Sequence, residues 1–379
     1  MRCRFRGRSL VGVELSGGLD SSSIACLSAS LRTENRDPIA EFETFSLTFS
    51  GRNCDESQFF ESAVRQWGLA SVVVREELQE LGWYAAQTQR YRDLPENPSG
   101  AMSEPILKAA TDRGLRVLLN GIGGDHWFEG CSVGNTAGRR ASLPRLIGGF
   151  GRLCQEMGFA AASRHARRRL RGAFTQTVGQ AVPVPCWIAP RFARKTSLAD
   201  RINPVEVADT VEPGIRKLRT LLNSGWTVHS NETTERSQSF AGIEGRSPFF
   251  DRRIIEFSFA IPEEQRGRGK CTKVVLRNAM RGLLPETIRN RDTKAEFGHT
   301  ACHALAAREA RNAFSCLRLG ELGWIDTVVA RRMYDRAQAD HSSGKLAVRL
   351  WPLWMIFAAE LWVERFVPSD HHTKPLVTH

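Results

Sequence analysis

Short apolar runs alternate with helix-like patterns along the first 130 or so residues of the chain. The runs that predict strands are 10–15 (LVGVEL), 41–49 (EFETFSLTF), 70–77 (ASVVVREE) and 115–121 (LRVLLNG). The segments between them with apolar residues at helical spacing are 21–31, 55–68 and 104–114. Strands and helices in alternation predict an α/β fold, in which helices cover both faces of a parallel sheet.

The pattern changes after about residue 130, where the strand signals fade. Glycine, arginine and proline fill residues 130–200, which predicts loops and irregular helices. Helical patterns dominate from there to the end, at 239–245 (SFAGIEG), 252–261 (RRIIEFSFAI), 270–285 (KCTKVVLRNAMRGLLP) and 323–340 (GWIDTVVARRMYDRAQAD). We therefore expect two domains, an α/β domain over residues 1–135 and a mostly helical domain over residues 136–379.

The most apolar segment of the chain is 350–362 (LWPLWMIFAAELW). A membrane-spanning helix needs about 20 predominantly apolar residues, and Pro352 and Glu360 interrupt this shorter run. We expect it to be a buried core helix, and we expect no membrane contact.

Charge and cysteine content narrow the class of protein further. The formal net charge is +12, and much of it lies between Arg139 and Arg171. This arginine-rich stretch is either a solvated surface or a docking surface for an acidic peptide, a nucleotide or RNA. The chain has nine cysteines, an odd number, and no two of them have C-x-x-C spacing. This argues against a disulfide framework and a zinc cluster and favours a reducing, cytoplasmic compartment.

The first predicted strand runs into a glycine turn, SGGLDSS. Helix N-termini at such turns present free N–H groups to anions, and glycine has no Cβ to hold a phosphate away. A carboxylate beside phosphates repels them unless Mg²⁺ lies between, so Asp20 is a candidate Mg²⁺ ligand. A tight turn with an N-capping aspartate would have the same pattern. The other residues of this turn that could hold phosphate are Ser16, Gly17, Gly18, Ser21 and Ser22.

The fourth predicted strand runs into a second glycine turn, GIGGD at 121–125. If both turns lie where the strand order reverses, Asp20 and Asp125 could hold Mg²⁺ on a pyrophosphate from both sides. Other nucleotide motifs are absent. The segment most like a Walker loop has Glu264 in place of the first glycine and Cys271 in place of the final serine or threonine. A G-x-G-x-x-G motif is also missing after the first predicted strand.

Four motifs together resemble a known family. The stretch 14–22 (ELSGGLDSS) resembles the pyrophosphate loop of the N-type ATP pyrophosphatases, or PP-loop superfamily, and 121–130 (GIGGDHWFEG) resembles the second signature of the asparagine synthetase family. Segments 244–257 and 276–297 resemble that family's R-x-P-F-x-D and L-P-x-x-I-x-R-x-x-K-x-x-F segments. The resemblance covers about residues 8–366. It implies a doubly wound parallel five-stranded sheet of the adenine nucleotide alpha hydrolase type, followed by a mostly helical domain.

The resemblance implies an ATP-dependent, AMP-forming carbon–nitrogen ligase. Such an enzyme adenylates a carboxylate, releases pyrophosphate, and lets an amine or ammonia attack the acyl-adenylate. Carried onto this chain, Lys294 would neutralise charge on the reacting phosphorus and the leaving pyrophosphate, Asp20 and Asp125 would bind Mg²⁺, and Leu47 and Gly121 would line the adenine. The pyrophosphate would be held by Ser16, Gly17, Gly18, Asp20, Ser21 and Ser22.

Other charged residues in these segments are expected to have supporting roles. Lys270 and Lys273 begin a helical pattern and are expected to be solvated, with a phosphate within possible reach of one of them. Arg246 and Asp251 are expected to form a structural ion pair or a helix cap rather than to act in catalysis.

The chain departs from the asparagine-forming members in three places. Ile122 stands where they have a glutamate, and His126 where the family commonly has another. The chain begins Met–Arg2–Cys3, so we expect no N-terminal glutaminase domain with its cysteine after the initiator methionine. These departures favour relatives that close an amide within one substrate, such as lasso-peptide macrolactam synthetases and β-lactam synthetases.

Several substrates and partners remain open at this point. The favoured reading is a peptide macrolactam-type ligase acting on a small-molecule or peptide carboxylate, with a leader peptide and a protease as possible partners. The alternative is asparagine biosynthesis with free ammonia or a separate glutaminase. A PP-loop enzyme that adenylates a tRNA base and a non-catalytic remnant are further alternatives. Nucleic acid is not the expected partner, because the two later segments resemble the amide-forming branch.

Overall fold

The computed structural model describes residues 1–7, 10–34, 39–130, 183–202, 213–268, 271–342 and 350–368. The chain forms two compact units that interleave along the sequence. The first contains Met1–Val74, Ile106–Gln180 and Glu206–Lys294, and the second contains Arg75–Pro105, Ala181–Val205 and Ala295–His379. The expected domain organisation has one boundary, at residue 135, whereas each compact unit contains three separate segments of the chain. The arginine-rich stretch 139–171 lies outside the described residues.

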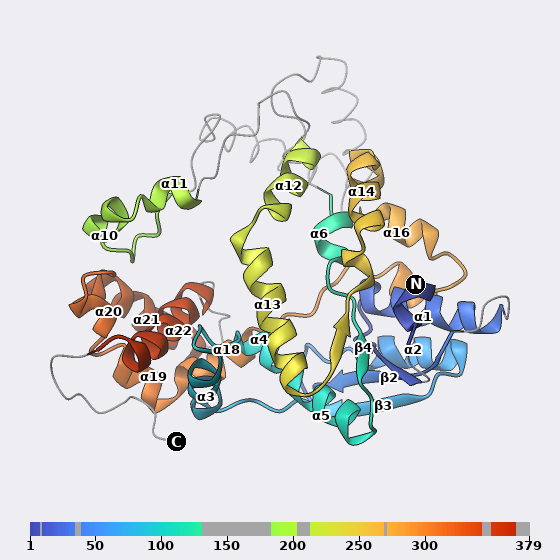
Figure 1. Ribbon diagram of the computed structural model, residues 1–379, viewed down its shortest axis with the longest axis horizontal. Helices are drawn as coiled ribbons and strands as arrows, with labels where there is room; N and C mark the ends of the chain where they lie inside the picture. Colours follow the sequence, from blue (N-terminus) through green and yellow to red (C-terminus); the bar gives the residue numbers. More distant parts are fainter. Residues whose placement is uncertain are drawn as a thin grey trace, which may run out of the picture. The chain divides into compact units, whose positions relative to one another are not determined.

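A five-stranded sheet forms the centre of the first unit (Figure 1). Its order is β3-β2-β1-β4-β5, and the pairs β1 with β2, β1 with β4 and β4 with β5 are parallel. The strand order therefore reverses between β1 and β4, where parallel α/β sheets bind their ligands. This arrangement confirms the predicted fold class. The bounds are β1 Leu10–Glu14, β2 Glu41–Thr48, β3 Ser71–Arg75, β4 Val117–Leu119 and β5 Glu244–Arg246.

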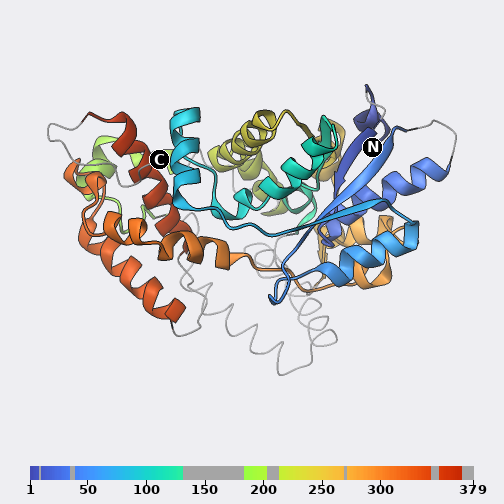
Figure 2. The same ribbon diagram turned by 90° about the horizontal axis from the view of Figure 1, so that it is seen from below.

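Helices cover both faces of this sheet (Figures 1 and 2). On one face, β1 packs through Val11 and Val13 against Ile24 of α1 (Leu19–Thr33). On the other, Leu118 of β4 packs against Leu107 of α5 (Glu104–Asp112). Burial of both faces explains why the central strands β1 and β4 consist mostly of apolar residues. The other helices of this unit are α2 Ser57–Trp67, α6 Gly124–Phe128, α12 Pro213–Leu222, α13 Gly225–Phe240, α14 Arg252–Ala260, α15 Glu263–Arg266, α16 Val274–Ala279 and α17 Glu286–Arg289.

The prediction of a helical pattern at 239–245 is wrong. Helix α13 ends at Phe240, and Gly242 at φ +72 turns the chain so that Ile243 enters the core and Glu244 begins β5. The amide of Glu244 donates to the carbonyl of Arg116 at 2.8 Å. Three residues are too few to show strand periodicity, so pairing with β4 decides the outcome. The helix predicted at 270–285 is likewise shorter, because Cys271–Thr272 (β7) pairs with Gly267–Arg268 (β6).

The described part of the second unit is helical. The predicted core helix is confirmed as α22 (Leu350–Phe366), in which Leu353, Ile356 and Phe357 are fully buried. Pro352 is tolerated because it lies in the first turn, where its missing N–H has no partner within the helix. The other helices are α3 Leu81–Tyr91, α4 Pro98–Ala101, α10 Pro190–Lys195, α11 Leu198–Ile202, α18 Gly298–Ala306, α19 Arg308–Ala313, α20 Arg318–Glu321 and α21 Thr327–Ser342.

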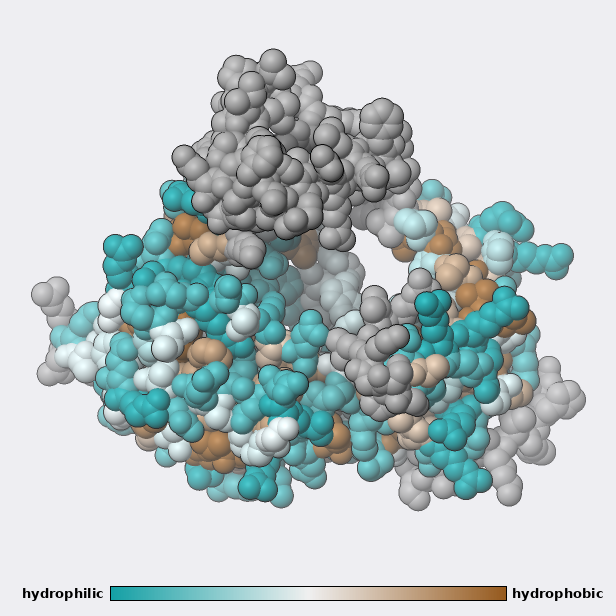
Figure 3. Space-filling model, turned by 180° about the vertical axis from the view of Figure 1, so that it is seen from behind, coloured by the Kyte–Doolittle hydropathy of each residue, from teal (hydrophilic) through white to brown (hydrophobic). Residues whose placement is uncertain are grey.

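Glu360 is the polar exception in the core of α22. It is fully buried, and its carboxylate accepts the backbone N–H groups of Arg318 at 2.6 Å and Leu319 at 3.1 Å, which open α20. Across the residues that the structure describes, none of the helices is both long and apolar enough to cross a bilayer. On the face drawn in Figure 3, apolar side chains are scattered among hydrophilic ones, as is usual for protein surfaces.

Candidate active site

The turn between β1 and α1 is built around serine hydroxyls. The Oγ atoms of Ser16 and Ser21 lie 2.8 Å apart, and Ser21 Oγ also accepts the N–H of Ser16 at 3.1 Å. Gly17 has φ +82, and a Cβ there would lie 2.8 Å from the Cβ of Phe59, so only glycine fits. Gly18 caps α1 without a side chain, which leaves the first N–H groups of a 15-residue helix facing the turn. This is a ready anion site.

The turn between β4 and α6 lies directly against the first one. A Cβ on Gly121 would come within 2.7 Å of the backbone nitrogen of Ser21, and one on Gly124 would overlap the carboxylate of Asp20. Gly123 has φ +104, in the left-handed region. Glycines thus allow the two turns to approach closely enough for their aspartates to meet.

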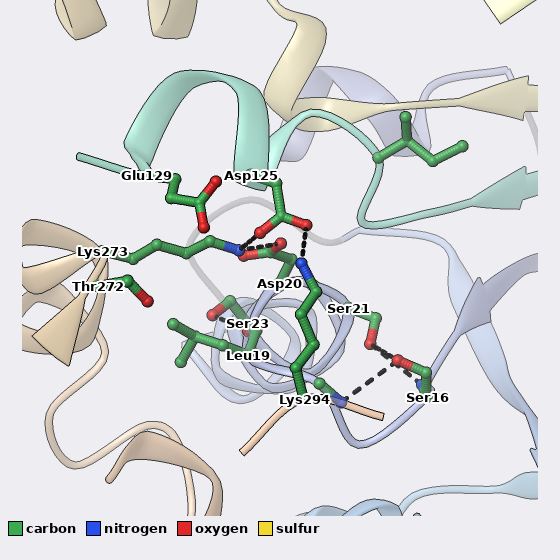
Figure 4. Close-up of polar contacts among 12 residues, drawn as sticks. Ser16, Leu19, Asp20, Ser21, Ser23, Asp125, Glu129, Thr272, Lys273 and Lys294 are labelled. Atoms are coloured by element: carbon green, nitrogen blue, oxygen red, sulfur yellow. Dashed lines mark hydrogen bonds and ion pairs between the residues drawn. The ribbon is translucent and has the colours of Figure 1, made fainter. Parts of the chain in front are cut away.

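Two aspartates and two lysines form one charge cluster at this junction (Figure 4). The Nζ of Lys273 lies 2.5 Å from Asp20 Oδ2 and 2.7 Å from Asp125 Oδ1. The Nζ of Lys294 donates to Asp125 Oδ2 at 2.8 Å. The structure therefore brings together Asp20, Asp125 and Lys294, which the sequence places far apart.

The prediction that Lys273 is solvated is wrong. Its side chain is 8 % exposed and lies between the two carboxylates. Its backbone has φ +55, just before α16. A lysine at the start of a helical pattern looks the same in sequence whether it contacts water or a carboxylate. The pattern therefore could not predict that Lys273 is buried. Lys270 lies outside the described residues.

The pKa values of the two aspartates shift in opposite directions. Burial raises the pKa of Asp20, and the ammonium of Lys273 only partly opposes this. Burial also acts to raise the pKa of Asp125, but Lys273 and Lys294 outweigh it and lower that pKa to about 2. The pKa of Lys294 is raised, because its contacts with Asp125 outweigh the effect of burial. Asp125 is therefore ionised at neutral pH.

The two aspartates fit a magnesium site that is completed by a phosphate ligand. Asp20 Oδ1 is buried and has no hydrogen-bond partner, so one oxygen is free for a cation. The described residues contain no group of three or more metal-ligating side chains. Mg²⁺ is commonly held by one or two carboxylates together with water and substrate phosphates, which is what this pair offers.

Arg291 joins the segment that carries Lys294 to the first glycine turn. Its guanidinium lies 2.5 Å from Glu56 Oε1, stacks 4.0 Å from the ring centroid of Phe59, and donates to the carbonyl of Gly17 at 3.5 Å. Both partners of the Arg291–Glu56 ion pair are nearly buried. These contacts hold the segment just before Lys294 against the first glycine turn. Sequence patterns could not reveal the Arg291–Glu56 pair, because the two residues are far apart in the chain.

The segment 244–257 supports the site rather than entering it. Arg246 pairs with Glu244 at 2.7 Å and donates to the carbonyl of Arg4 at 2.6 Å. Asp251 caps α14 by accepting the N–H of Arg253 at 3.0 Å, which confirms the predicted helix cap. Arg246 forms its ion pair with Glu244, and Asp251 forms ion pairs with Arg4 and Arg253. Arg246 and Asp251 are therefore not paired with each other, although Arg4 contacts both of them.

The remaining predicted residues lie around the junction. Leu47 is half-buried near the end of β2, and Gly121 lies in the second turn, whereas the hydroxyl of Ser22 is buried without a hydrogen-bond partner. His126 lies 5.5 Å from the ring of Phe250, and its Nδ1 is buried without a partner. Burial lowers the pKa of His126, which keeps it neutral near pH 7.

Comparison with known proteins agrees with this geometry. Residues 1–364 match the family model described as asparagine synthase. A search of curated protein sequences finds no match to the chain. The match includes residues of both compact units and every residue of the charge cluster.

Proposed function

We propose that this chain, which belongs to the asparagine synthase family, makes an amide bond by adenylating a carboxylate. Family membership shows an ATP-dependent ligase of the amide-bond synthetase class. In the proposed reaction, a carboxylate oxygen attacks the α-phosphorus of ATP, the α–β bond breaks, and pyrophosphate leaves. An amine then attacks the acyl carbon, and AMP departs with the former carboxylate oxygen.

The convergence of Asp20 and Asp125 from two glycine turns supports this proposal most directly. Both turns lie at the carboxyl ends of neighbouring parallel strands, where the strand order reverses. The hydroxyls of Ser16 and Ser21 and the open N–H groups of α1 would bind the leaving pyrophosphate. The side chain of Lys294 is largely exposed, so it could reach a phosphate while Asp125 orients its ammonium group. Preorganised charge of this kind is typically the largest contribution to catalysis.

Asp20 and Asp125 would hold Mg²⁺, which would supply positive charge against the phosphates when bound. Lys273 keeps the two carboxylates close to one another by contacting both. It thereby reduces the repulsion that would otherwise oppose their approach.

A peptide macrolactam-type substrate is the favoured acceptor, in which the amine and the carboxylate belong to one molecule. Ile122 is apolar and cannot act as a base or polar partner for ammonia or aspartate, and its N–H is already donated to Asn120 Oδ1 at 3.1 Å. The adjacent His126 is neutral and offers no fixed charge. Asparagine formation from aspartate and ammonia, supplied free or by a separate glutaminase, is the second candidate, favoured by the family match.

An AMP-release assay distinguishes the peptide substrate from aspartate plus ammonia. The chain is incubated with ATP and magnesium, and with either aspartate plus ammonium or peptides that carry an acidic side chain and a free N-terminal amine. We expect AMP and pyrophosphate in equal amounts with a peptide, and a product that has lost the elements of one water. Turnover of aspartate plus ammonium alone would favour the second candidate. ADP in place of AMP would contradict the adenylation step, and the D20A chain serves as the blank.

A further inference from the structure

Arg266 is a buried arginine at the end of the short helix α15. Only 2 % of its side chain is exposed, and its guanidinium donates to three backbone carbonyls. Nη1 donates to the carbonyl of Trp127 at 2.8 Å, Nε donates to that of Ile261 at 3.3 Å, and Nη2 donates to that of Ser258. The carboxylate of Glu263 lies 3.7 Å from Nε. Because a buried charge is costly unless it is paired and hydrogen-bonded, these contacts together hold the guanidinium in the core.

The three carbonyls belong to the C-terminal ends of two different helices. Helix α14 ends at Ala260, so Ser258 lies in its last turn and Ile261 is its C-cap. Trp127 is the last residue but one of α6. The final carbonyls of a helix have no partner within the helix, and they form the negative end of its dipole, where a cation is favourable. Arg266 therefore joins the end of α6 to the end of α14.

A second cation lies at the same end of α6. The Nζ of Lys217, on α12, donates to the carbonyls of Glu129 at 3.2 Å and Gly130 at 3.4 Å. Helix α6 has only five residues, and its N-cap, Gly123, offers no side chain. A helix this short is not stable by itself, so its place depends on the helices α12, α14 and α16 that contact it. Arg266 and Lys217 supply polar contacts at its C-terminal end.

This short helix carries Asp125 in its first turn, facing Lys273 (Figure 4). Arg266 directly precedes β6, and the paired strand β7 leads directly to Lys273. The two segments touch at their backbones, since a Cβ on Gly130 would lie 2.8 Å from the nitrogen of Gly267. The segment that carries Asp125 and the segment that carries Lys273 therefore meet beside Arg266.

We propose that Arg266, together with Lys217, is a positioning residue for Asp125. By holding the C-terminal end of α6, the two cations keep the carboxylate of Asp125 close enough to Asp20 for both to act on one magnesium pyrophosphate. The inference rests on the proposed function, because it takes magnesium pyrophosphate to bind at these aspartates. In this role neither cation touches the ligand, and both act through Asp125.

The test is a double-mutant cycle, measured as equilibrium binding of magnesium pyrophosphate to the full chain. R266K keeps the positive charge but loses the planar fork that reaches three carbonyls. We expect R266K to weaken binding by about 10-fold, which lies in the usual range for coupled residues. D125A keeps the first glycine turn and should still bind pyrophosphate measurably. In the D125A chain, R266K should change the affinity by less than about 2-fold, because the residue through which Arg266 acts is gone.

A purely structural role would not produce this dependence on Asp125. E360A is the matched control, because it also leaves backbone groups without their partner. At a temperature where circular dichroism shows every variant folded, E360A should bind magnesium pyrophosphate as the wild type does.

K217M provides a second cycle if R266K does not fold. The side chain of Lys217 is 33 % exposed, and we expect K217M to weaken binding by about 3-fold, again only when Asp125 is present. A folded variant that binds like the wild type, or that loses as much affinity without Asp125 as with it, would overturn the positioning role. Failure of the wild type to bind magnesium pyrophosphate would overturn the proposed function and this inference with it.

Discussion

Buried carboxylates in the two units are treated in opposite ways. In the second unit, Glu360 is fully buried, and both of its oxygens accept backbone N–H groups. In the first unit, Asp20 is half-buried and its buried Oδ1 has no hydrogen-bond partner. Glu14 is also half-buried and has no partner among the described residues. A satisfied buried acid stabilises a fold, whereas an unsatisfied one costs stability until something binds it. The contrast favours the carboxyl-end edge of the sheet as the ligand site of the proposed function.

The largest effect is expected from removing either aspartate of the charge cluster, Asp20 or Asp125. D20A and D125A should each lower the rate of exchange of labelled pyrophosphate into ATP by about 100-fold or more, because preorganised charge on the reacting phosphates is lost. Their thermal unfolding should stay cooperative. The control is D335A, which removes an exposed aspartate that is paired with Arg331 on α21. Wild-type exchange in either active-site variant would contradict the site assignment.

A smaller effect is expected from Lys294, which contacts only one of the two aspartates. K294A should lower kcat by about 10- to 100-fold and leave ATP affinity largely unchanged, because the lysine acts on charge that develops in the transition state. Steady-state kinetics and equilibrium ATP binding separate the two effects. If K294A weakened ATP binding as much as it lowered kcat, Lys294 would be a ground-state ligand only.

The satisfied acid should behave in the reverse manner. E360A leaves the N–H groups of Arg318 and Leu319 without an acceptor, and should lower the free energy of unfolding by about 1–3 kcal/mol. Urea unfolding followed by circular dichroism measures this. Pyrophosphate exchange at a temperature well below the transition should match the wild type. Loss of pyrophosphate exchange in a folded E360A chain would contradict the purely structural role of Glu360.

The smallest effect is expected in the acid stability of the chain. The pKa of Asp125 falls from its ordinary 3.8 to about 2 in the folded chain. A lowered folded-state pKa contributes stability above pH 4, and that contribution is lost as pH falls toward about 2. The D125N chain cannot titrate there. The wild type's advantage over D125N in urea unfolding should therefore shrink between pH 4 and pH 2, and a constant difference would contradict the ion pairs with Lys273 and Lys294.

The parts of the site closest together in sequence were the most predictable. Glycine turns followed by Asp20 and Asp125 could be recognised at the ends of apolar runs, because strand, turn and helix start are local patterns. Local patterns also predicted four of the five strands, and the parallel sheet agrees with the expected fold class. The buried position of α22 followed from its apolar composition alone.

Other features depended on residues distant in the chain. Strand β5 is three residues long and exists because it pairs with β4. Lys273 is separated from Asp20 by 253 positions, and only the folded chain shows that its ammonium lies between two carboxylates. Arg291 likewise holds the Lys294 segment to the glycine turn through Glu56.

The sequence by itself determined which local turns could bind a phosphate and which faces of strands and helices would be buried, because backbone geometry and apolar periodicity act over a few residues. Only the tertiary structure decided which charges meet and which buried acids go unpaired. A partner across hundreds of residues leaves no periodic trace in the sequence, and its energy depends on distances of a few ångströms that only packing sets.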